Sequence, residues 1–326
     1  MNILITGGAG YIGSHAVKYF KSLNHNVIVV DNLSTGFSDS IDESISFYNI
    51  SIHNVEELTN ILTKESIEAV IHFAAYSLVN ESVKDPLKYY HNNVEGGRSL
   101  IKAMINADVD KIIFSSTAAV YGEQLKQPID ENATLNPTNP YGESKWMIEK
   151  ILNSVSKVST LKYVTLRYFN VAGAHHDNSI GERHNPETHL IPNLIKSTLK
   201  SNKAFTLFGV DHNTPDGTAI RDYIHVEDLV EAHALALDYL IKNKESNYFN
   251  LGTENGHSVK EILSMTEKVT GKKIKVNIED KRPGDPATLI ASHQKAKRLL
   301  HWQPKRDLKT IIESAYQFHL KEETND

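Results

Sequence analysis

The feature that most constrains this fold is a glycine-rich segment near the start of the sequence. Gly7-Gly8-Ala9-Gly10-Tyr11-Ile12-Gly13 lies between a strand expected at 2–6 and a helix expected at 13–23. Glycines at such a junction permit a tight turn and let backbone N–H groups at the positive end of the helix approach a pyrophosphate. Taken alone, the pattern also fits an ordinary glycine-rich turn. Between a strand and a helix, it predicts a dinucleotide site that includes Gly7, Gly10, Tyr11, Ile12 and Gly13.

The second expected strand, 26–31, ends in a carboxylate. Asp31 follows Gly13 by 18 residues, close to the separation at which an acidic side chain accepts hydrogen bonds from the ribose hydroxyls of a dinucleotide. A carboxylate at this position also repels a 2′-phosphate. The glycine segment and Asp31 together therefore predict NAD, rather than NADP, as the cofactor.

Short β-branched runs alternate with helical patterns through the first half of the sequence. Such alternation predicts parallel strands with helices on both faces. The other strands of this half are expected at 68–73, 111–116 and 162–167, and the other helices at 55–64, 92–106 and 141–157. The expected fold class is therefore α/β, a Rossmann-type doubly wound parallel sheet.

The pattern changes after residue 172. From Gly173 to Glu187 the residues are mostly of types that form an irregular exposed connection. We therefore expect an NAD-binding domain at 1–172 and a smaller α/β substrate-binding lobe at 173–326, from which some segments return to the first domain. In this lobe, helices are expected at 189–200, 226–241, 259–270, 293–300 and 308–320, and strands at 247–251 and 274–278.

Composition excludes several classes of function. The 326 residues include no cysteine, which excludes a disulfide framework and a thiolate metal site. The net charge of −5 argues against nucleic acid as a partner. Apolar runs are too short to cross a bilayer and a strand already begins at residue 2, so we expect no membrane partner, no signal peptide and a cytoplasmic location. His175, His176, His184 and His189 show no established zinc spacing, so we expect a solvated loop and no metal.

A tyrosine and a lysine stand four residues apart in the segment Tyr141-Gly142-Glu143-Ser144-Lys145. On a helix they share one face, so the phenol and the ammonium can cooperate. A nearby positive charge lowers the pKa of a phenol, which allows the phenolate to act as a base. The strand at 111–116 leads into Thr117, whose hydroxyl would lie at the sheet edge where ligands bind. These three residues are candidates for catalysis, and a packed tyrosine beside a solvated lysine is the alternative.

An ordered set of segments gives the sequence a family resemblance. It resembles the extended short-chain dehydrogenase/reductase family and, within it, the 4-epimerases of UDP-hexoses, over essentially its whole length. Besides the glycine segment, the resemblance rests on Asp31-Asn32-Leu33, His72-Phe73-Ala74-Ala75, Tyr90-His91-Asn92-Asn93-Val94, Ser115-Ser116-Thr117-Ala118-Ala119-Val120-Tyr121-Gly122, Arg167-Tyr168-Phe169-Asn170, Asp216-Gly217-Thr218, Arg221-Asp222-Tyr223-Ile224-His225-Val226, Asn250-Leu251-Gly252 and Arg282-Pro283-Gly284-Asp285.

The resemblance implies an epimerase that inverts carbon 4 of UDP-glucose or UDP-galactose through a transient 4-keto sugar. Tyr141 would remove the proton of the 4-hydroxyl while a hydride leaves carbon 4 for a tightly bound NAD. The keto sugar would then turn its other face to the cofactor and take the hydride back. Lys145 would bind the nicotinamide ribose, and Thr117 would hydrogen-bond the reacting hydroxyl.

The resemblance also assigns binding roles and a partner. The cofactor site would be completed by Asn32, Phe73, Ala74, Asn92, Tyr168 and Phe169. A UDP-sugar would be bound by Asn170, Arg221, Tyr223, Arg282 and Asp285, since guanidinium groups match phosphate oxygens. A homodimer would form through the helices at 92–106 and 141–157.

Three positions depart from the family pattern. Ser51 stands where many relatives carry an acid that contacts adenine, and the segment 73–77 lacks a lysine that some epimerases have near the cofactor. Leu289, counted from Asp285, replaces an aromatic residue near the sugar. The smaller leucine leaves room for an acetamido group, so we expect slower but measurable turnover of the N-acetylated pair. A UDP-N-acetylglucosamine 4-epimerase or a dual-specificity enzyme is therefore the main alternative.

Two further alternatives are weaker. A sugar-nucleotide dehydratase or decarboxylase would usually carry an acid where this sequence has Ala118-Ala119, and neither alanine can move protons at carbons 5 and 6. A non-catalytic NAD-sensing module would have no need for both Tyr141 and Lys145.

Overall fold

Seven parallel strands form the main sheet of the protein, seen here in a computed structural model that describes residues 1–199, 204–282 and 286–325. The strand order is β10-β6-β5-β4-β1-β2-β3. These strands are β1 (Asn2–Thr6), β2 (Asn26–Val30), β3 (Ser46–Tyr48), β4 (Ala69–His72), β5 (Lys111–Thr117), β6 (Lys162–Tyr168) and β10 (Asn247–Leu251). Every pairing in the sheet is parallel, so the predicted doubly wound fold class is confirmed.

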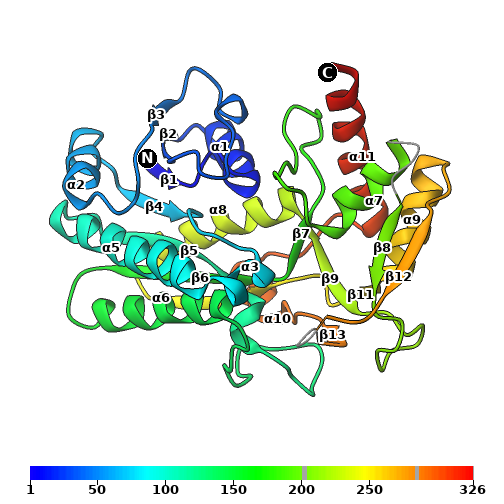
Figure 1. Cartoon of the computed structure of the whole chain (residues 1–326). Coiled ribbons are helices and arrows are strands. Elements are labelled where there is room, and N and C mark those ends of the chain that lie inside the picture. The colour runs from blue at the N-terminus through cyan, green and yellow to red at the C-terminus, as the bar shows by residue number, and fades with distance from the viewer. Residues whose placement is uncertain (200–203, 283–285, 326) are drawn as a thin grey trace.

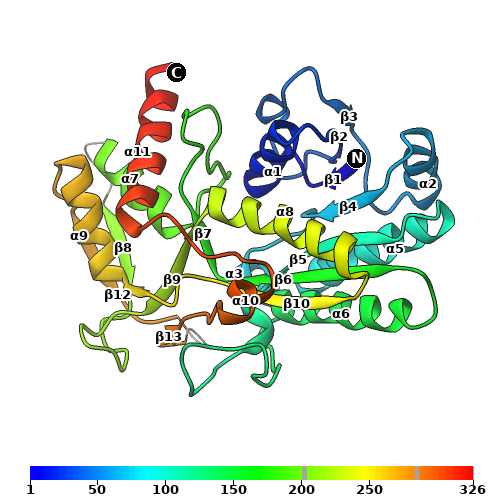
Figure 2. The ribbon, with the colours of Figure 1, turned by 180° about the vertical axis from the view of Figure 1, so that it is seen from behind.

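Helices cover both faces of this sheet (Figures 1 and 2). One face is covered by α2 (Val55–Lys64), α5 (Gly96–Asn106) and α6 (Pro140–Ser156), and the other by α1 (Tyr11–Ser22) and α8 (Val226–Asn243). Interior parallel strands are therefore apolar at successive positions. In β1, Leu4 packs into the core on the first face, whereas Ile3 and Ile5 pack into the core on the second.

The position of β1 determines where a ligand can bind. β1 pairs with β2 on one side and with β4 on the other, so the chain winds away from it in both directions. In open α/β sheets, ligands bind at the carboxyl ends of the strands beside such a switch point. The glycine segment follows β1 and Phe73 follows β4, so both reach this edge.

The second half of the chain builds smaller sheets beside the main one. In one, β9 (Ile220–His225) pairs with β7 (Asn170–Ala172), β11 (Gly256–Ser258) and β13 (Thr288–Leu289), and in the other, β8 (Phe205–Phe208) pairs with β12 (Val276–Glu279). Helices α7 (Leu190–Leu199), α9 (Val259–Thr270) and α11 (Leu308–Asn325) pack on one another in this lobe (Figure 1). The division of the chain at residue 172 stays a prediction, while α8 and β10 lie in the layers of the main sheet.

Several short elements were not predicted. They are β3, β7, β8, β9, β11 and β13 and the helices α3 (Val79–Lys84) and α4 (Pro86–Tyr89). The first residues of the helix expected at 92–106 belong instead to a π-helical turn, Tyr90–Glu95, which buries Asn93 and leads into α5 at Gly96. Helix α10 (Gln294–Leu299) agrees with the expected helix at 293–300.

The connection after β7 is less exposed than expected. Ala174 is fully buried and Glu182 is 4% exposed, so the expectation of a solvated loop is wrong for these positions.

Among the helices in the described ranges, none combines the length and the apolar character that a membrane crossing requires.

Candidate functional site

The glycine segment closes tightly at the carboxyl end of β1. A Cβ atom on Gly13 would lie 2.0 Å from the carbonyl oxygen of Gly7, and one on Gly7 would lie 2.5 Å from the backbone nitrogen of Ala74. Gly7 also adopts φ +74°, a conformation that favours glycine. At the N-cap of α1, Gly10 has no side chain to occupy the first N–H groups of the helix. This terminus therefore suits an anion such as a pyrophosphate.

Asp31 lies beside this loop at the end of β2 and is 8% exposed. Its Oδ2 accepts a hydrogen bond from the backbone nitrogen of Ala9 at 2.9 Å, and its Oδ1 accepts one from Leu33 at 2.8 Å. These two bonds hold the carboxylate against the glycine loop, and each oxygen keeps a lone pair for a ribose hydroxyl. Asn32 is exposed next to it and accepts from the backbone nitrogen of Ser34 at 3.1 Å. This arrangement of donors and acceptors fits NAD.

The far wall of the cofactor region joins β4, β6 and α8. The Phe73 ring stands 4.8 Å, centre to centre, from the imidazole of His233, which is fully buried on α8. His233 Nε2 lies 3.0 Å from Ser115 Oγ, and Ser115 also lies near the hydroxyl of Tyr168. Burial raises the pKa of Tyr168. The sequence did not indicate His233, because a lone histidine on an apolar helix face carries no motif.

Two neighbouring asparagines differ in role. Asn92, which was predicted to line the cofactor site, is half-buried, and its amide donates to Asn93 Oδ1 at 3.0 Å. Asn93 is 3% exposed and binds both the backbone nitrogen and the backbone oxygen of Tyr76, at 2.9 and 3.0 Å, as well as Ser144 Oγ at 3.0 Å. Asn93 therefore ties the segment after β4 to helix α6, a positioning role that the motif did not separate from that of Asn92.

The two candidate catalytic hydroxyls meet at the carboxyl end of β5. Thr117 is the last residue of β5, and its side chain lies close enough to the hydroxyl of Tyr141 to lower the pKa of that phenol. Tyr141 lies in the first turn of α6, whose N-cap Asn139 accepts a hydrogen bond from the backbone nitrogen of Gly142 at 2.9 Å. Burial raises the pKa of Tyr141, and the nearby side chain of Thr117 works against that rise.

Lys145 is one turn further along α6 and is 4% exposed. Its Nζ donates to the carbonyl oxygen of Ser115 at 2.8 Å and stands 5.1 Å from the ring centre of Phe114. Burial lowers the pKa of Lys145 to about 7, and the negative charge of Glu149 partly opposes the shift. Glu149 is itself bound by Arg167 at 2.6 Å. Lys145 can therefore gain or lose its charge near neutral pH.

Four predicted substrate residues gather on one small sheet. Asn170 on β7 pairs with Tyr223 on β9, and Arg221 on β9 pairs with Leu289 on β13. Tyr223 is 6% exposed, and Arg221 Nη1 donates to a neighbouring carbonyl oxygen at 2.7 Å. Leu289 packs against the buried cluster of Val120, Tyr121 and Ile129, which Phe169 also contacts. The small sheet thus reaches the residues that follow β5 and β6.

The last two predicted substrate residues are not part of this sheet. Arg282 is exposed, and its guanidinium carbon stands 4.1 Å from the ring centre of Phe208. Asp285 lies outside the described residues. The geometry therefore leaves both roles as predictions.

The family described as "NAD dependent epimerase/dehydratase family" matches residues 3–252 of this chain. The chain belongs to that family. The UDP-glucose 4-epimerase of Lactobacillus helveticus is 50% identical to this chain over 320 residues. The match covers 98% of this chain and 97% of the relative. The resemblance found in the sequence is therefore confirmed.

Solved structures extend this similarity to three dimensions. A crystal structure of a UDP-glucose 4-epimerase matches this chain with a TM-score of 0.96 and 52% identity. The match covers 99% of this chain and 98% of the other. The UDP-glucose 4-epimerase of Bifidobacterium longum, in complex with NAD+ and UDP, has a TM-score of 0.95 and 34% identity over 100% of both chains. The similarity thus includes both the main sheet and the substrate lobe.

Proposed function

We propose that this protein inverts carbon 4 of UDP-glucose and UDP-galactose with NAD as a bound cofactor. The observation that carries the proposal is the proximity of Thr117 and Tyr141 at the carboxyl edge of the sheet, with Lys145 one helical turn away. This edge also carries the glycine loop. The predicted cofactor is the one in the family's description, and the predicted enzyme class is that of a relative at 50% identity.

The side chains divide the proton chemistry between them. NAD held by the glycine loop and Asp31 would supply the hydride acceptor and donor for carbon 4 of the sugar. Tyr141 removes the proton of the 4-hydroxyl and later gives it back. Thr117 orients the phenol and can hydrogen-bond the reacting hydroxyl. Because burial raises the pKa of Tyr141, the phenolate needs a nearby positive charge, and Lys145 supplies one.

The residues after Thr117 favour epimerisation over dehydration or decarboxylation. Ala118 and Ala119 form the short helical turn directly after β5, and Ala118 is 6% exposed. Dehydration at carbons 5 and 6 requires a side chain that moves protons. Methyl groups at this position cannot do so.

The substrate pocket supports a second, slower pair of substrates. Leu289 and Phe169 pack on the same cluster after β5. Leu289 therefore lies where the small sheet of β7, β9 and β13 meets the residues that follow β5 and β6. A leucine fills less space than an aromatic side chain would. We therefore propose slower turnover of UDP-N-acetylglucosamine and UDP-N-acetylgalactosamine beside the plain hexoses.

We also propose that the protein acts as a homodimer. Val83 on α3 and Leu87 on α4 are 62% and 77% exposed, and both helices pack against α6. Exposed apolar side chains at this place suit an interface that continues over α5 and α6. Light scattering after gel filtration should report twice the chain mass of 36.6 kDa.

A cysteine-free chain also suits the cytoplasm, the location that we propose.

The decisive experiment is to incubate purified protein with UDP-galactose carrying deuterium at carbon 4, without added NAD, and to separate the products. We expect UDP-glucose that retains the deuterium, because one bound cofactor takes and returns the hydride. Denatured protein should release NAD. A deoxy-keto sugar or a pentose as the main product would refute the proposal.

A further inference from the structure

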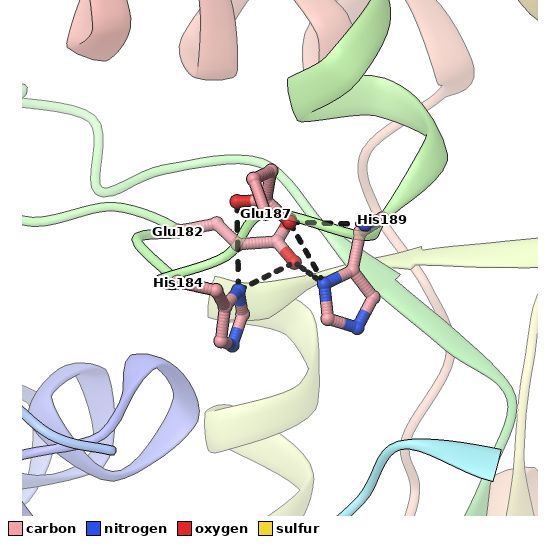
Figure 3. Close-up of side chains that lie close together, drawn as sticks. All are labelled: Glu182, His184, Glu187 and His189. Carbon is pink, nitrogen blue, oxygen red and sulfur yellow. Dashed lines mark hydrogen bonds and ion pairs between the residues drawn. The ribbon is translucent and has the colours of Figure 1, made fainter. Parts of the chain in front are cut away.

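Four side chains with metal-binding atoms converge between β7 and α7. They are Glu182, His184, Glu187 and His189, and one ligand atom from each lies within 4.8 Å of all the others. Figure 3 shows that both imidazole rings turn a nitrogen toward the two carboxylates. The remaining histidines of the connection, His175 and His176, group with Glu227 instead.

Four separations between histidine nitrogens and carboxylate oxygens in this cluster are close to those between ligand atoms around one ion. His184 Nδ1 lies 3.6 Å from Glu182 Oε1 and 3.6 Å from Glu187 Oε2. His189 Nδ1 lies 3.1 Å from Glu182 Oε1 and 3.1 Å from Glu187 Oε1. Zn²⁺ binds such atoms at about 2.0–2.2 Å, which places tetrahedral ligand atoms about 3.3–3.6 Å apart. The observed separations therefore need only a small adjustment to hold an ion.

The two carboxylates need positive charge that the surrounding residues supply only in part. The side chains of Glu182 and Glu187 are 4% and 5% exposed, so water screens their mutual repulsion poorly. Lys196 Nζ stands 3.9 Å from Glu187 Oε2, which is beyond hydrogen-bond distance. Glu187 Oε2 and His184 Nδ1 are buried without a hydrogen-bond partner. Buried polar atoms are rarely left in this state, and these two point into the cluster.

We propose that Glu182, His184, Glu187 and His189 together bind one Zn²⁺ ion. Two imidazoles and two carboxylates form a ligand set that zinc accepts, and a divalent ion balances the two negative charges. Four protein ligands leave no open position, so the ion is structural. It fixes the connection from β7 against the first turn of α7, which begins at the residue after His189.

The sequence had led us to expect no metal here. The spacing Glu182-x-His184-x-x-Glu187-x-His189 is not an established zinc motif, and the tertiary structure brings these residues together with both carboxylates buried. This inference does not depend on the proposed epimerase activity, because its test measures metal and stability.

The first test measures zinc in tag-free protein. Protein treated with a chelator, reloaded with zinc chloride and dialysed should contain one zinc ion per chain by mass spectrometry. His184→Ala and Glu187→Gln should lose it. His91→Ala is the matched control, because His91 belongs to the exposed group of His53, His91 and Glu95 and should leave the zinc content unchanged.

The second test follows thermal unfolding. Zinc should raise the Tm of the chelator-treated wild type, because the ion binds the folded state, and should leave Glu187→Gln unaffected. Glu187→Gln removes one buried charge, so this variant should fold without metal, which near-ultraviolet circular dichroism checks. Wild type that binds no zinc and shows no Tm change, zinc retained by both cluster variants, or zinc lost in His91→Ala would each overturn the proposal.

Discussion

The two walls of the site are built in different ways. The catalytic wall comes from β5 and α6, where Thr117 and Lys145 are 7% and 4% exposed and hydrogen bonds hold both side chains. The substrate wall comes from β7, β9 and β13, which are only 3, 6 and 2 residues long, and Asn170 on β7 is exposed.

This difference separates chemistry from selectivity. A buried, hydrogen-bonded wall keeps the proton-transfer groups in one geometry, so a change there should abolish the reaction or shift a pKa. A wall of short paired strands presents side chains whose size can vary without disturbing the main sheet. We therefore expect large effects from the catalytic wall and graded effects from the substrate wall.

The strongest test of this contrast is Tyr141→Phe. The variant keeps the ring but removes the hydroxyl to which we assign the proton transfer, so kcat should fall by about 10²–10⁴. Binding of UDP, measured by calorimetry, should persist because the substrate wall is unchanged. Tyr19→Phe on the outer helix α1 is the control and should retain wild-type turnover. Near-normal turnover of Tyr141→Phe would mean that another group is the base.

The second test uses the pH dependence of stability. Burial lowers the pKa of Lys145 to about 7, while the unfolded chain keeps the ordinary value of 10.5. Between these pH values the unfolded state binds more protons, so the contribution of this group to the free energy of unfolding rises with pH from about 7 to 10.5, and below about 7 it stays constant.

In cofactor-free protein, the difference in free energy of unfolding between wild type and Lys145→Met should therefore increase from pH 7 to pH 10, by on the order of a few kcal/mol. Denaturant unfolding at a series of pH values measures it. A difference that stays constant over this range would contradict a buried lysine on the catalytic wall.

The third test asks whether the glycine loop belongs to the rigid part of the molecule. In Gly13→Ala the new Cβ would meet the oxygen of Gly7 at 2.0 Å, so the loop must move. We expect a loss of stability of about 1–3 kcal/mol and less NAD released on denaturation. In Gly10→Ala the nearest atom is at 3.4 Å, an ordinary contact, so its Tm should stay close to that of wild type.

The smallest effect should come from the substrate wall. Leu289→Tyr enlarges the side chain at the junction with Phe169 and should slow turnover of the N-acetylated pair relative to the plain pair, by about 1–3 kcal/mol in selectivity. Competition assays that give kcat/KM for both pairs measure this effect. Leu299→Tyr on α10 is the control. Equal losses on both pairs would show that Leu289 only packs the lobe.

Much of the catalytic wall could be predicted because its signals are local. Strand β5 and helix α6 begin and end within one residue of the predicted bounds, and outside this wall α2, α9, β1 and β10 begin and end at the predicted residues. Thr117 and Tyr141 could be paired in advance because parallel strands bring their carboxyl ends to one edge of the sheet. His233 and Asn93 could not, because their roles depend on partners 118 and up to 51 residues away in the sequence.

The sequence by itself determined the glycine loop, the ribose carboxylate, the Tyr141 and Lys145 pair and the alternation of strands and helices, since each depends on neighbouring residues and their backbone preferences. Only the tertiary structure decided which short strands pair in the substrate wall and how far burial shifts the pKa of Lys145. It also decided that the buried carboxylates of Glu182 and Glu187 lie beside two histidines. Burial and pairing depend on segments distant in the sequence, so no local pattern specifies them.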